Sequence, residues 1–424
     1  MKMKRALATW LGIYSRRRVV TLVAVGLLLT GSASYGAEVG GVYTEASTKD
    51  LGDILKVDFF KGLKFRGWID VYFEGNFNNP KRSVVEANQN LSVIKSRDLT
   101  IEGRTFDVHD RSFSLSLAEL EVEKVPDRGG VGFKVDLAFG DTQDIIVDSI
   151  KAASGGSSVS DFDRYIQHAS ISYVAPIGRG LRLDLGKFVT HIGGETIESI
   201  KNHNYSHAFF FTYAIPFQDT GLRVHYDWTD TFYTEFYVIN GWNVTSDNNK
   251  AKTFGPSIGW VPSPQFSVYF NYLVGNEQTD NDKLFKNLRH IFDAQVTFTP
   301  IEPLNFSLNL DYAWEDGALN GRTKDAQWGG ITGVVRYKVT DVLEPALRVE
   351  YYRDDDGFTT GLRQSLVGVT ATINYKIGIS KFGNILVRPE YRFDHSNGDF
   401  FSHKRDFMSR KTQHTLGIGT VVYF

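Results

Sequence analysis

The sequence predicts an all-β protein: a transmembrane antiparallel β-barrel of about sixteen strands, with short periplasmic turns and longer extracellular loops. Three observations support this prediction. Segments of roughly ten residues alternate between apolar and polar side chains along most of the chain, as tilted membrane strands do. The connections between the segments are alternately short and long. The sequence also contains 20 Tyr and 31 Phe, and aromatic residues form girdles at the two edges of a membrane barrel.

The composition excludes several other classes of protein. The net charge of −2 gives no field that would attract nucleic acid. Cysteine is absent, which excludes thiolate metal sites and a disulfide framework. The mean hydropathy of −0.23 excludes a helical membrane protein but not a barrel, because only alternate residues of a barrel strand touch lipid.

The N-terminus has the pattern of an export signal. Basic residues between Lys2 and Arg18 precede the apolar run Val19–Thr30, and small residues follow it. This run is too short to cross a bilayer, which takes ~20 residues. We therefore place a cleavage site between Gly36 and Ala37.

The expected organisation has three parts: a signal peptide at 1–36, a short N-terminal segment at 37–60 and one barrel domain at 61–424. We expect export by the general secretory route to the outer membrane of a Gram-negative-type bacterium.

The first alternating segment is FRGWIDVYFEGNF at 65–77, where the odd positions are mainly apolar and the even positions polar. The second segment places Phe113, Leu115 and Leu117 on its apolar face and then changes phase to Leu120 and Val122. The other apolar halves span 131–139, 165–173, 181–189, 222–228, 232–238, 254–260, 266–274, 288–298, 304–314, 331–339, 343–351, 367–375, 385–393 and 416–424. A closed barrel leaves no strand edge, so we expect the last segment to pair with the first.

Short and long connections alternate along the whole chain, which is typical of membrane barrels. The short ones lie at 126–130, 176–180, 229–231, 262–265, 300–303, 340–341 and 378–383. The longer, more polar ones include 78–111, 141–162, 191–219, 276–286, 315–324, 354–361 and 395–410.

The polar halves of the segments carry charges that a bilayer would not accept, since an Arg or Lys at mid-depth costs ~2–4 kcal/mol. We therefore expect these side chains to face a water-filled lumen, which about sixteen strands make wide enough for a channel. For any one arginine, pairing with a neighbouring carboxylate is a simpler role than ion selectivity. The pore-lining candidates are Arg66, Asp70, Arg182, Asp184, Arg223, Arg289, Asp293, Arg348, Glu350 and Arg388.

The connection 191–219 is a candidate constriction loop, because in general porins a long loop after the fifth strand folds inward. Glu195, Glu198 and Lys201 would then face arginines of the wall and produce a transverse field. The alternative is a loop that covers the outside as a lid.

Histidines provide weak signals for other sites. His203 and His207 have the i, i+4 spacing of metal ligands on a helix, but no acidic motif accompanies them. His290 and His414 have the parity of lipid-facing residues, as a lipid-acting enzyme would need, but no suitable serine motif is present. We expect no catalytic residue, no metal and no cofactor.

Four stretches resemble the OmpL-like family of outer-membrane β-barrel porins. They are FSLSLAELEVEKV from Phe113, LDLGKFVTHIGGETIES from Leu183, NYSHAFFFTYAIPFQDTGLR from Asn204 and VINGWN from Val238. The resemblance implies passive diffusion of small solutes and supplies no catalytic residues. The long first loop, 78–111, does not match anything in this resemblance, so its role stays open.

The sequence thus favours a porin for small hydrophilic solutes or ions, in contact with outer-membrane lipid and not with nucleic acid. A homotrimer is an expectation that the sequence leaves open, because every segment is apolar outside. The alternative function is a barrel-anchored surface adhesin or receptor whose loops bind a partner. Conductance in a planar bilayer would distinguish the two.

Overall fold

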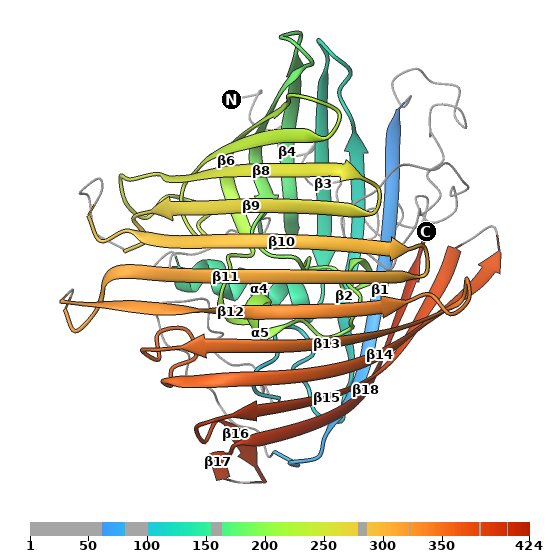
Figure 1. Cartoon of the computed structure of the whole chain (residues 1–424), viewed down its shortest axis with the longest axis vertical. Helices are drawn as coiled ribbons and strands as arrows, with labels where there is room; N and C mark the ends of the chain where they lie inside the picture. Colours follow the sequence, from blue (N-terminus) through green and yellow to red (C-terminus); the bar gives the residue numbers. More distant parts are fainter. Residues whose placement is uncertain are drawn as a thin grey trace, which may run out of the picture.

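The structure, a computed structural model, describes residues 62–80, 101–153, 163–278, 286–321, 323–380, 383–404 and 406–424. Sixteen antiparallel strands form a closed barrel (Figure 1). This confirms the predicted fold class and strand number. The expected signal peptide at 1–36 and the segment 37–60 lie outside the described residues. In the part of the chain that is described, no helix is long and apolar enough to cross a membrane.

Each wall strand pairs with its sequence neighbours, and β15 pairs with β18. The strands are β1 (Leu63–Asn76), β2 (Phe113–Lys124), β3 (Val131–Phe139), β4 (Ile166–Ala175), β5 (Leu181–Val189), β6 (Gln218–Asp227), β7 (Phe232–Ile239), β8 (Thr253–Ser263), β9 (Phe266–Gly275), β10 (Arg289–Ile301), β11 (Leu304–Leu319), β12 (Lys324–Tyr337), β13 (Leu343–Asp354), β14 (Gln364–Ser380), β15 (Gly383–Ser396) and β18 (Thr412–Tyr423).

The seam between β1 and β18 closes the barrel, as the sequence predicted. The two strands are antiparallel and pair Trp68 with Tyr423. The backbone N–H of Phe424 donates to the carbonyl of Gly67 at 3.0 Å. The phenyl ring of Phe424 fills the space above Gly67, where a Cβ atom would overlap it. The glycine therefore allows the last residue to lie flat against the first strand.

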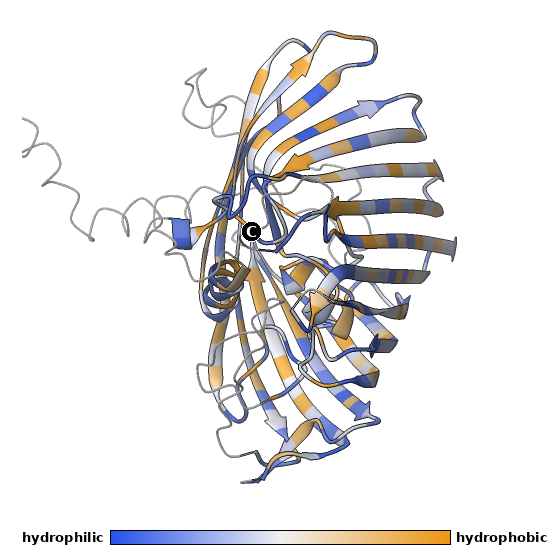
Figure 2. Cartoon of the chain, turned by 90° about the vertical axis from the view of Figure 1, so that its left-hand side faces the viewer, coloured by the Kyte–Doolittle hydropathy of each residue, from blue (hydrophilic) through white to orange (hydrophobic). Residues whose placement is uncertain are grey.

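The outer and inner faces differ as the alternation predicted. On β13, Leu347 and Val349 are 45% and 50% exposed outside, whereas Arg348 and Glu350 are buried inside. Figure 2 shows the same alternation of hydropathy along many strands. Aromatic residues line the outside, including a pair between Trp260 and Phe266 with ring centroids 6.0 Å apart.

One residue on β2 points the other way from its prediction. The register passes from Asp70 opposite Leu117 to Val71 opposite Leu115, so Ser116 is an extra residue in a β-bulge. The bulge turns Leu117 inward, where it is buried against Trp68. The prediction of Leu117 on the apolar outer face was therefore wrong, and the phase change in the sequence marks this bulge.

Two ends of the barrel can be distinguished by their connections. We call the end with the short connections the turn end and the opposite end the loop end. Four helical segments of the described residues lie at the loop end: α4 (Asp141–Ala153), the 3-10 helices η2 (Asp163–Tyr165) and η3 (Ser199–Lys201), and α5 (Phe209–Tyr213).

Two loops differ from their prediction. The predicted long loop at 315–324 is instead a tight hairpin, because β11 extends to Leu319 and β12 starts at Lys324. The loop 395–410 contains a separate hairpin of β16 (Phe401–His403) and β17 (Asp406–Arg410).

Candidate functional site

The connection between β5 and β6, residues 190–217, lies against the inner wall of the barrel, and we call it the inner loop. The Ser199 hydroxyl donates to a carboxylate oxygen of Asp70 on β1 at 2.5 Å. The Tyr205 hydroxyl donates to the other oxygen of Asp70 at 3.0 Å. On the far side of the lumen, the Gly194 amide donates to Asn309 on β11 at 2.8 Å. The loop therefore crosses the interior, and it is not an outer lid.

Two buried arginines of the wall hold this loop in place. Arg348 on β13 donates to Glu195 at 2.7 Å and to the Ser206 carbonyl at 2.5 Å. Arg388 on β15 donates to the carbonyls of Ser199 at 2.5 Å and of Asn202 at 2.8 Å. Both guanidinium groups are used to bind loop backbone, which leaves them no contact with water.

Two carboxylates of the wall accept hydrogen bonds from amides of the loop. Glu390 on β15 accepts from the backbone of Tyr205 at 2.7 Å and of Ser206 at 3.0 Å. Glu350 on β13 accepts from the Phe209 amide at 2.5 Å. This amide is at the start of α5, where the first backbone N–H groups have no partner within the helix. The wall thus provides hydrogen-bond partners for both backbone N–H groups and backbone carbonyl groups of the loop.

The three candidates on the loop have different partners. Glu195 faces the wall arginine Arg348, as predicted. Glu198 accepts from Gln167 at 2.9 Å and lies 3.6 Å from the ammonium of Lys201. Lys201 also lies over the Trp68 ring, 5.3 Å from its centroid. Their role in a constriction stays a prediction.

The wall candidates fall into two groups. Arg66, Arg182 and Arg223 are near the turn end, and their side chains are 23%, 33% and 33% exposed. Each is paired with carboxylates: Arg66 with Glu121, Arg182 with Asp184, and Arg223 with Glu235. The buried candidates are Asp70, Asp184, Arg289, Asp293, Arg348, Glu350 and Arg388. Their assignment as pore-lining residues stays a prediction.

Near the loop end, apolar side chains occupy inward positions of the wall between buried charged residues such as Arg289 and Glu315, which was not predicted from the sequence. Along β10, the inward residues change from Thr297 and Gln295 to Asp293 and then to the fully buried Ile291. The loop-end cluster includes, among wall residues, Ile239, Leu273, Ile291, Ala313, Ala326, Trp328, Tyr352 and Leu366. The sequence does contain a signal for this cluster. Near the strand ends, apolar side chains occupy the alternate positions that face the inside of the barrel.

The helix α4 and the described part of the first loop complete this loop-end cluster. Ile145, Ile146 and Ile150 form the buried face of α4 at helical spacing. Phe106 packs against Phe211, with ring centroids 5.7 Å apart. The loops therefore form an apolar core inside the outer half of the barrel.

One buried arginine fixes the first loop to the wall. Arg104 donates to Asp394 on β15 and to the Thr415 hydroxyl on β18, both at 2.7 Å. Its ion pairs with Asp394, Glu74 and Asp107 raise the pKa of Arg104 further above its usual value. The sequence could not indicate this contact, because the partners are far apart along the chain.

The histidine pair His203 and His207 does not form a metal site of the kind considered. Residues 202–208 are not helical, so the spacing does not place both imidazoles on one helix face. His207 contacts the Thr196 carbonyl at 2.7 Å through Nε2. Burial, together with the nearby charges of Arg336 and Arg388, lowers the pKa of His203 to about 3. His203 is therefore neutral at pH 7.

The lipid-facing histidines have aromatic partners. His290 stacks on Trp314 with ring centroids 4.3 Å apart, and its Nδ1 lies 2.6 Å from the Tyr272 hydroxyl. His414 makes the same kind of contact with Tyr391 at 2.7 Å. Both belong to the outer aromatic surface.

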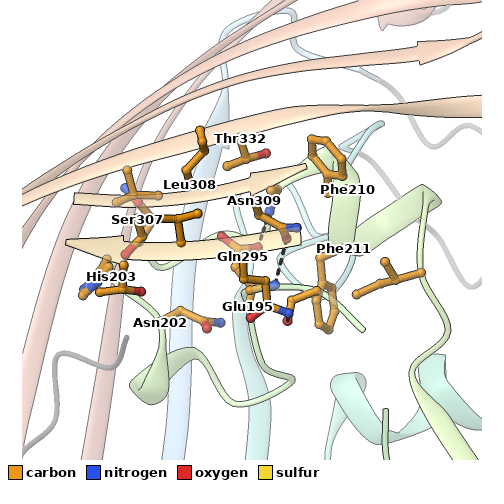
Figure 3. A pocket seen from close by; sticks show the side chains of 18 of the residues that line it. Glu195, Asn202, His203, Phe210, Phe211, Gln295, Ser307, Leu308, Asn309 and Thr332 are labelled. Carbon is orange, nitrogen blue, oxygen red and sulfur yellow. Dashed lines mark hydrogen bonds between the residues drawn. The ribbon is translucent and has the colours of Figure 1, made fainter. Parts of the chain in front are cut away.

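A cavity remains between the inner loop and the wall of β10–β12 (Figure 3). Its volume is about 700 Å³, including the part open to solvent. Gln295 and Asn309 line it from the wall, and Glu195, Phe210 and Phe211 line it from the loop. The Gln295 amide donates to the Gly193 carbonyl at 2.9 Å, which fixes one rim of the cavity.

Comparison with solved structures shows the fold of outer-membrane porins. OmpT of Vibrio cholerae in its trimer form is 14% identical, with a TM-score of 0.51, and the match covers 85% of this chain and 99% of that one. The channel DcaP of Acinetobacter baumannii is 11% identical (TM-score 0.53, 85% and 97% covered). An anion-selective porin from Comamonas acidovorans is 10% identical (TM-score 0.54, 85% and 99% covered).

No curated protein matches the sequence. A family model does match, over residues 62–424, and its description is "Putative beta-barrel porin-2, OmpL-like". The match covers the whole barrel and agrees with the resemblance drawn from the sequence. The chain therefore belongs to the OmpL-like family of β-barrel porins, which are proteins of the Gram-negative outer membrane.

Proposed function

We propose that this porin lets small hydrophilic solutes or ions diffuse through its lumen. The observation that supports this most directly is the charged inner wall at the turn end. Arg66, Arg182 and Arg223 are partly exposed there, although each is paired with a carboxylate. Rows of charged side chains on a wet wall are what sets ion selectivity in pores.

The inner loop would narrow the proposed path. It crosses the lumen between Asp70 on β1 and Asn309 on β11, and the cavity lined by Gln295 lies on one side of it. Glu195 and Arg348 place opposite charges at this level. The passage for solutes would therefore follow the β10–β12 side, because the opposite side is filled by bonds between the loop and β13–β15.

Single-channel recording in a planar bilayer tests this function. We expect discrete conductance steps, and a reversal potential under a salt gradient that gives the ion preference. Removing the charges of Arg182 and Arg223 together should shift that potential towards cation preference. A folded protein with no steps under any voltage would contradict the proposed diffusion.

A second function is favoured by the loop-end cluster. Because Phe106, α4 and α5 fill the outer half of the barrel with apolar side chains, the barrel could serve as an anchor for a surface adhesin or receptor. That function predicts no conductance and binding through the loops.

We also propose a homotrimer as the assembly. The support is the trimeric form of OmpT, a structure with the same fold. Crosslinking in native membranes, followed by mass measurement, would test it. A single monomeric band at all crosslinker concentrations would contradict it.

A further inference from the structure

Three carboxylates meet on the inner wall away from the loop-end cluster. Glu119 and Glu121 lie on β2, and Asp136 lies on the adjacent β3, directly opposite Glu121. One oxygen from each lies within 4.8 Å of the other two. All three side chains are buried. Like charges at this distance repel strongly unless something between them compensates for the charge.

The compensation by nearby cations is incomplete. Lys134 lies 3.1 Å from Glu121 and 3.5 Å from Asp136. Both oxygens of Glu119 and the Oδ1 atom of Asp136 are nonetheless buried without a hydrogen-bond partner. A buried carboxylate oxygen without a partner carries a large desolvation penalty. Three such oxygens facing one patch therefore indicate a missing ligand.

The charge balance of the patch gives the sign of the charge of that ligand. Among the described residues that interact here, five are carboxylates: Glu119, Glu121, Glu123, Asp136 and Glu198. Four cations lie beside them: Arg66, Lys134, Lys201, and Lys64, which is directly opposite Glu123 on β1. With all groups ionised, negative charge is in excess, which a bound cation would neutralise.

We propose that Glu119, Glu121 and Asp136 bind a divalent cation of the calcium class on the inner wall. Calcium takes oxygen ligands at about 2.3–2.6 Å, so ligands on opposite sides of the ion lie up to about 5 Å apart. Three oxygens that lie within 4.8 Å of one another can therefore all contact one such ion. The donor set contains oxygen alone, which suits calcium or magnesium and not zinc or copper.

The bound ion would join three parts of the molecule. It would hold β2 to β3, and through Glu198 and Lys201 it would stabilise the side of the inner loop that lies against this wall. No metal was expected from the sequence, where Glu119, Glu121 and Asp136 were not considered as ligands.

The structure also supplies a spectroscopic probe. Trp68 on β1 is the direct cross-strand neighbour of Glu119 on β2. Both side chains point inward and are buried. Because opposite residues in a sheet have Cβ atoms about 5 Å apart, the indole should transfer excitation to a terbium ion that replaces calcium.

The test uses the purified protein in detergent micelles, with terbium as the probe and calcium or magnesium as competitors. We expect tryptophan-sensitised terbium emission that calcium displaces. The Trp68→Phe variant should lose most of this emission, and calcium should still raise its unfolding temperature by about 2 °C or more, as for the original protein.

The matched variants are Glu119→Gln and Glu123→Gln. Glu119→Gln should lose at least tenfold in terbium affinity, whereas Glu123→Gln, whose carboxylate binds Arg66, should change it less than threefold. If Glu119→Gln fails to fold, Asp136→Asn takes its place with the same expectation. Equal terbium binding by both glutamine variants, or no effect of calcium on unfolding, would overturn the proposal and leave Glu119 as a protonated acid.

Discussion

The two halves of the lumen are built on the same strands but by different chemistry. At the turn end, Arg182 and Arg223 are paired with carboxylates and remain about one third exposed. At the loop end, inward positions carry Ile291, Trp328 and Tyr352, which are fully buried under the loops. The difference teaches that the polarity of the inner face is set locally by what covers it: water at one end and loop side chains at the other.

The largest loss of stability should come from breaking the contacts between the wall and the inner loop. Arg348→Ala removes one of the two guanidinium partners of the buried Glu350, leaving only Arg392, and releases Glu195. Breaking a buried charge pair typically costs about 3–5 kcal/mol. We expect rapid hydrogen exchange in the backbone of 191–217, measured by mass spectrometry.

The matched control for this variant is Arg182→Ala at the turn end. Its guanidinium is partly exposed, so the change should cost less than about 1 kcal/mol. Equal rates of hydrogen exchange in residues 191–217 of the two variants would show that the charged groups of the two halves do not differ in their contribution to stability.

A smaller effect is expected from the apolar side of α4. Ile146 is fully buried in the loop-end cluster, and Ile146→Ala should lower the free energy of unfolding by about 2–4 kcal/mol. Denaturant titration followed by tryptophan fluorescence would measure it. On the opposite face of the helix, Asp148→Ala should change little, because its partner is the partly exposed Lys151.

Acid should weaken the inner loop more than the turn-end wall. Burial lowers the pKa values of His191 and His203 to about 3, against about 6.5 in an unfolded chain. Their contribution to stability is therefore complete above pH 6.5 and is lost as the pH falls towards 3, by about 1.4 kcal/mol per unit for each histidine. Hydrogen exchange in 191–217 at pH 7 and pH 5 would show this, and His203→Gln should reduce the difference.

A clear effect on transport is expected at the turn end. Arg182→Glu combined with Arg223→Glu reverses two partly exposed charges, which lie beside the buried carboxylates of Asp184 and Glu235. The reversal potential should move towards cation preference. An unchanged potential would show that solutes do not pass this part of the wall.

Much of the wall was predictable because alternation is a local property of a strand. Leu347 and Arg348 are neighbours in the sequence, and their faces follow from the period of two. The inner loop contacts were not predictable in detail, since Glu195 and Arg348 are 153 positions apart. The loop-end cluster was not predicted, because only charged and polar residues of the inward faces were considered, and apolar inward residues such as Trp328 were not. Helix α4 was missed because its Ile145, Ile146 and Ile150 spacing is short and lies within a predicted loop.

The seam between β1 and β18 has a consequence for how the molecule is made. Its partners come from opposite extremes of the barrel sequence, so joining them carries the greatest chain-closure entropy of any strand pair and completes the ring late. Until then, two unpaired edges can recruit strands from other molecules. Once the ring of Phe424 covers Gly67, both edges disappear together. Assembly is therefore safest when the two ends of the wall meet inside the bilayer, away from other unfinished chains.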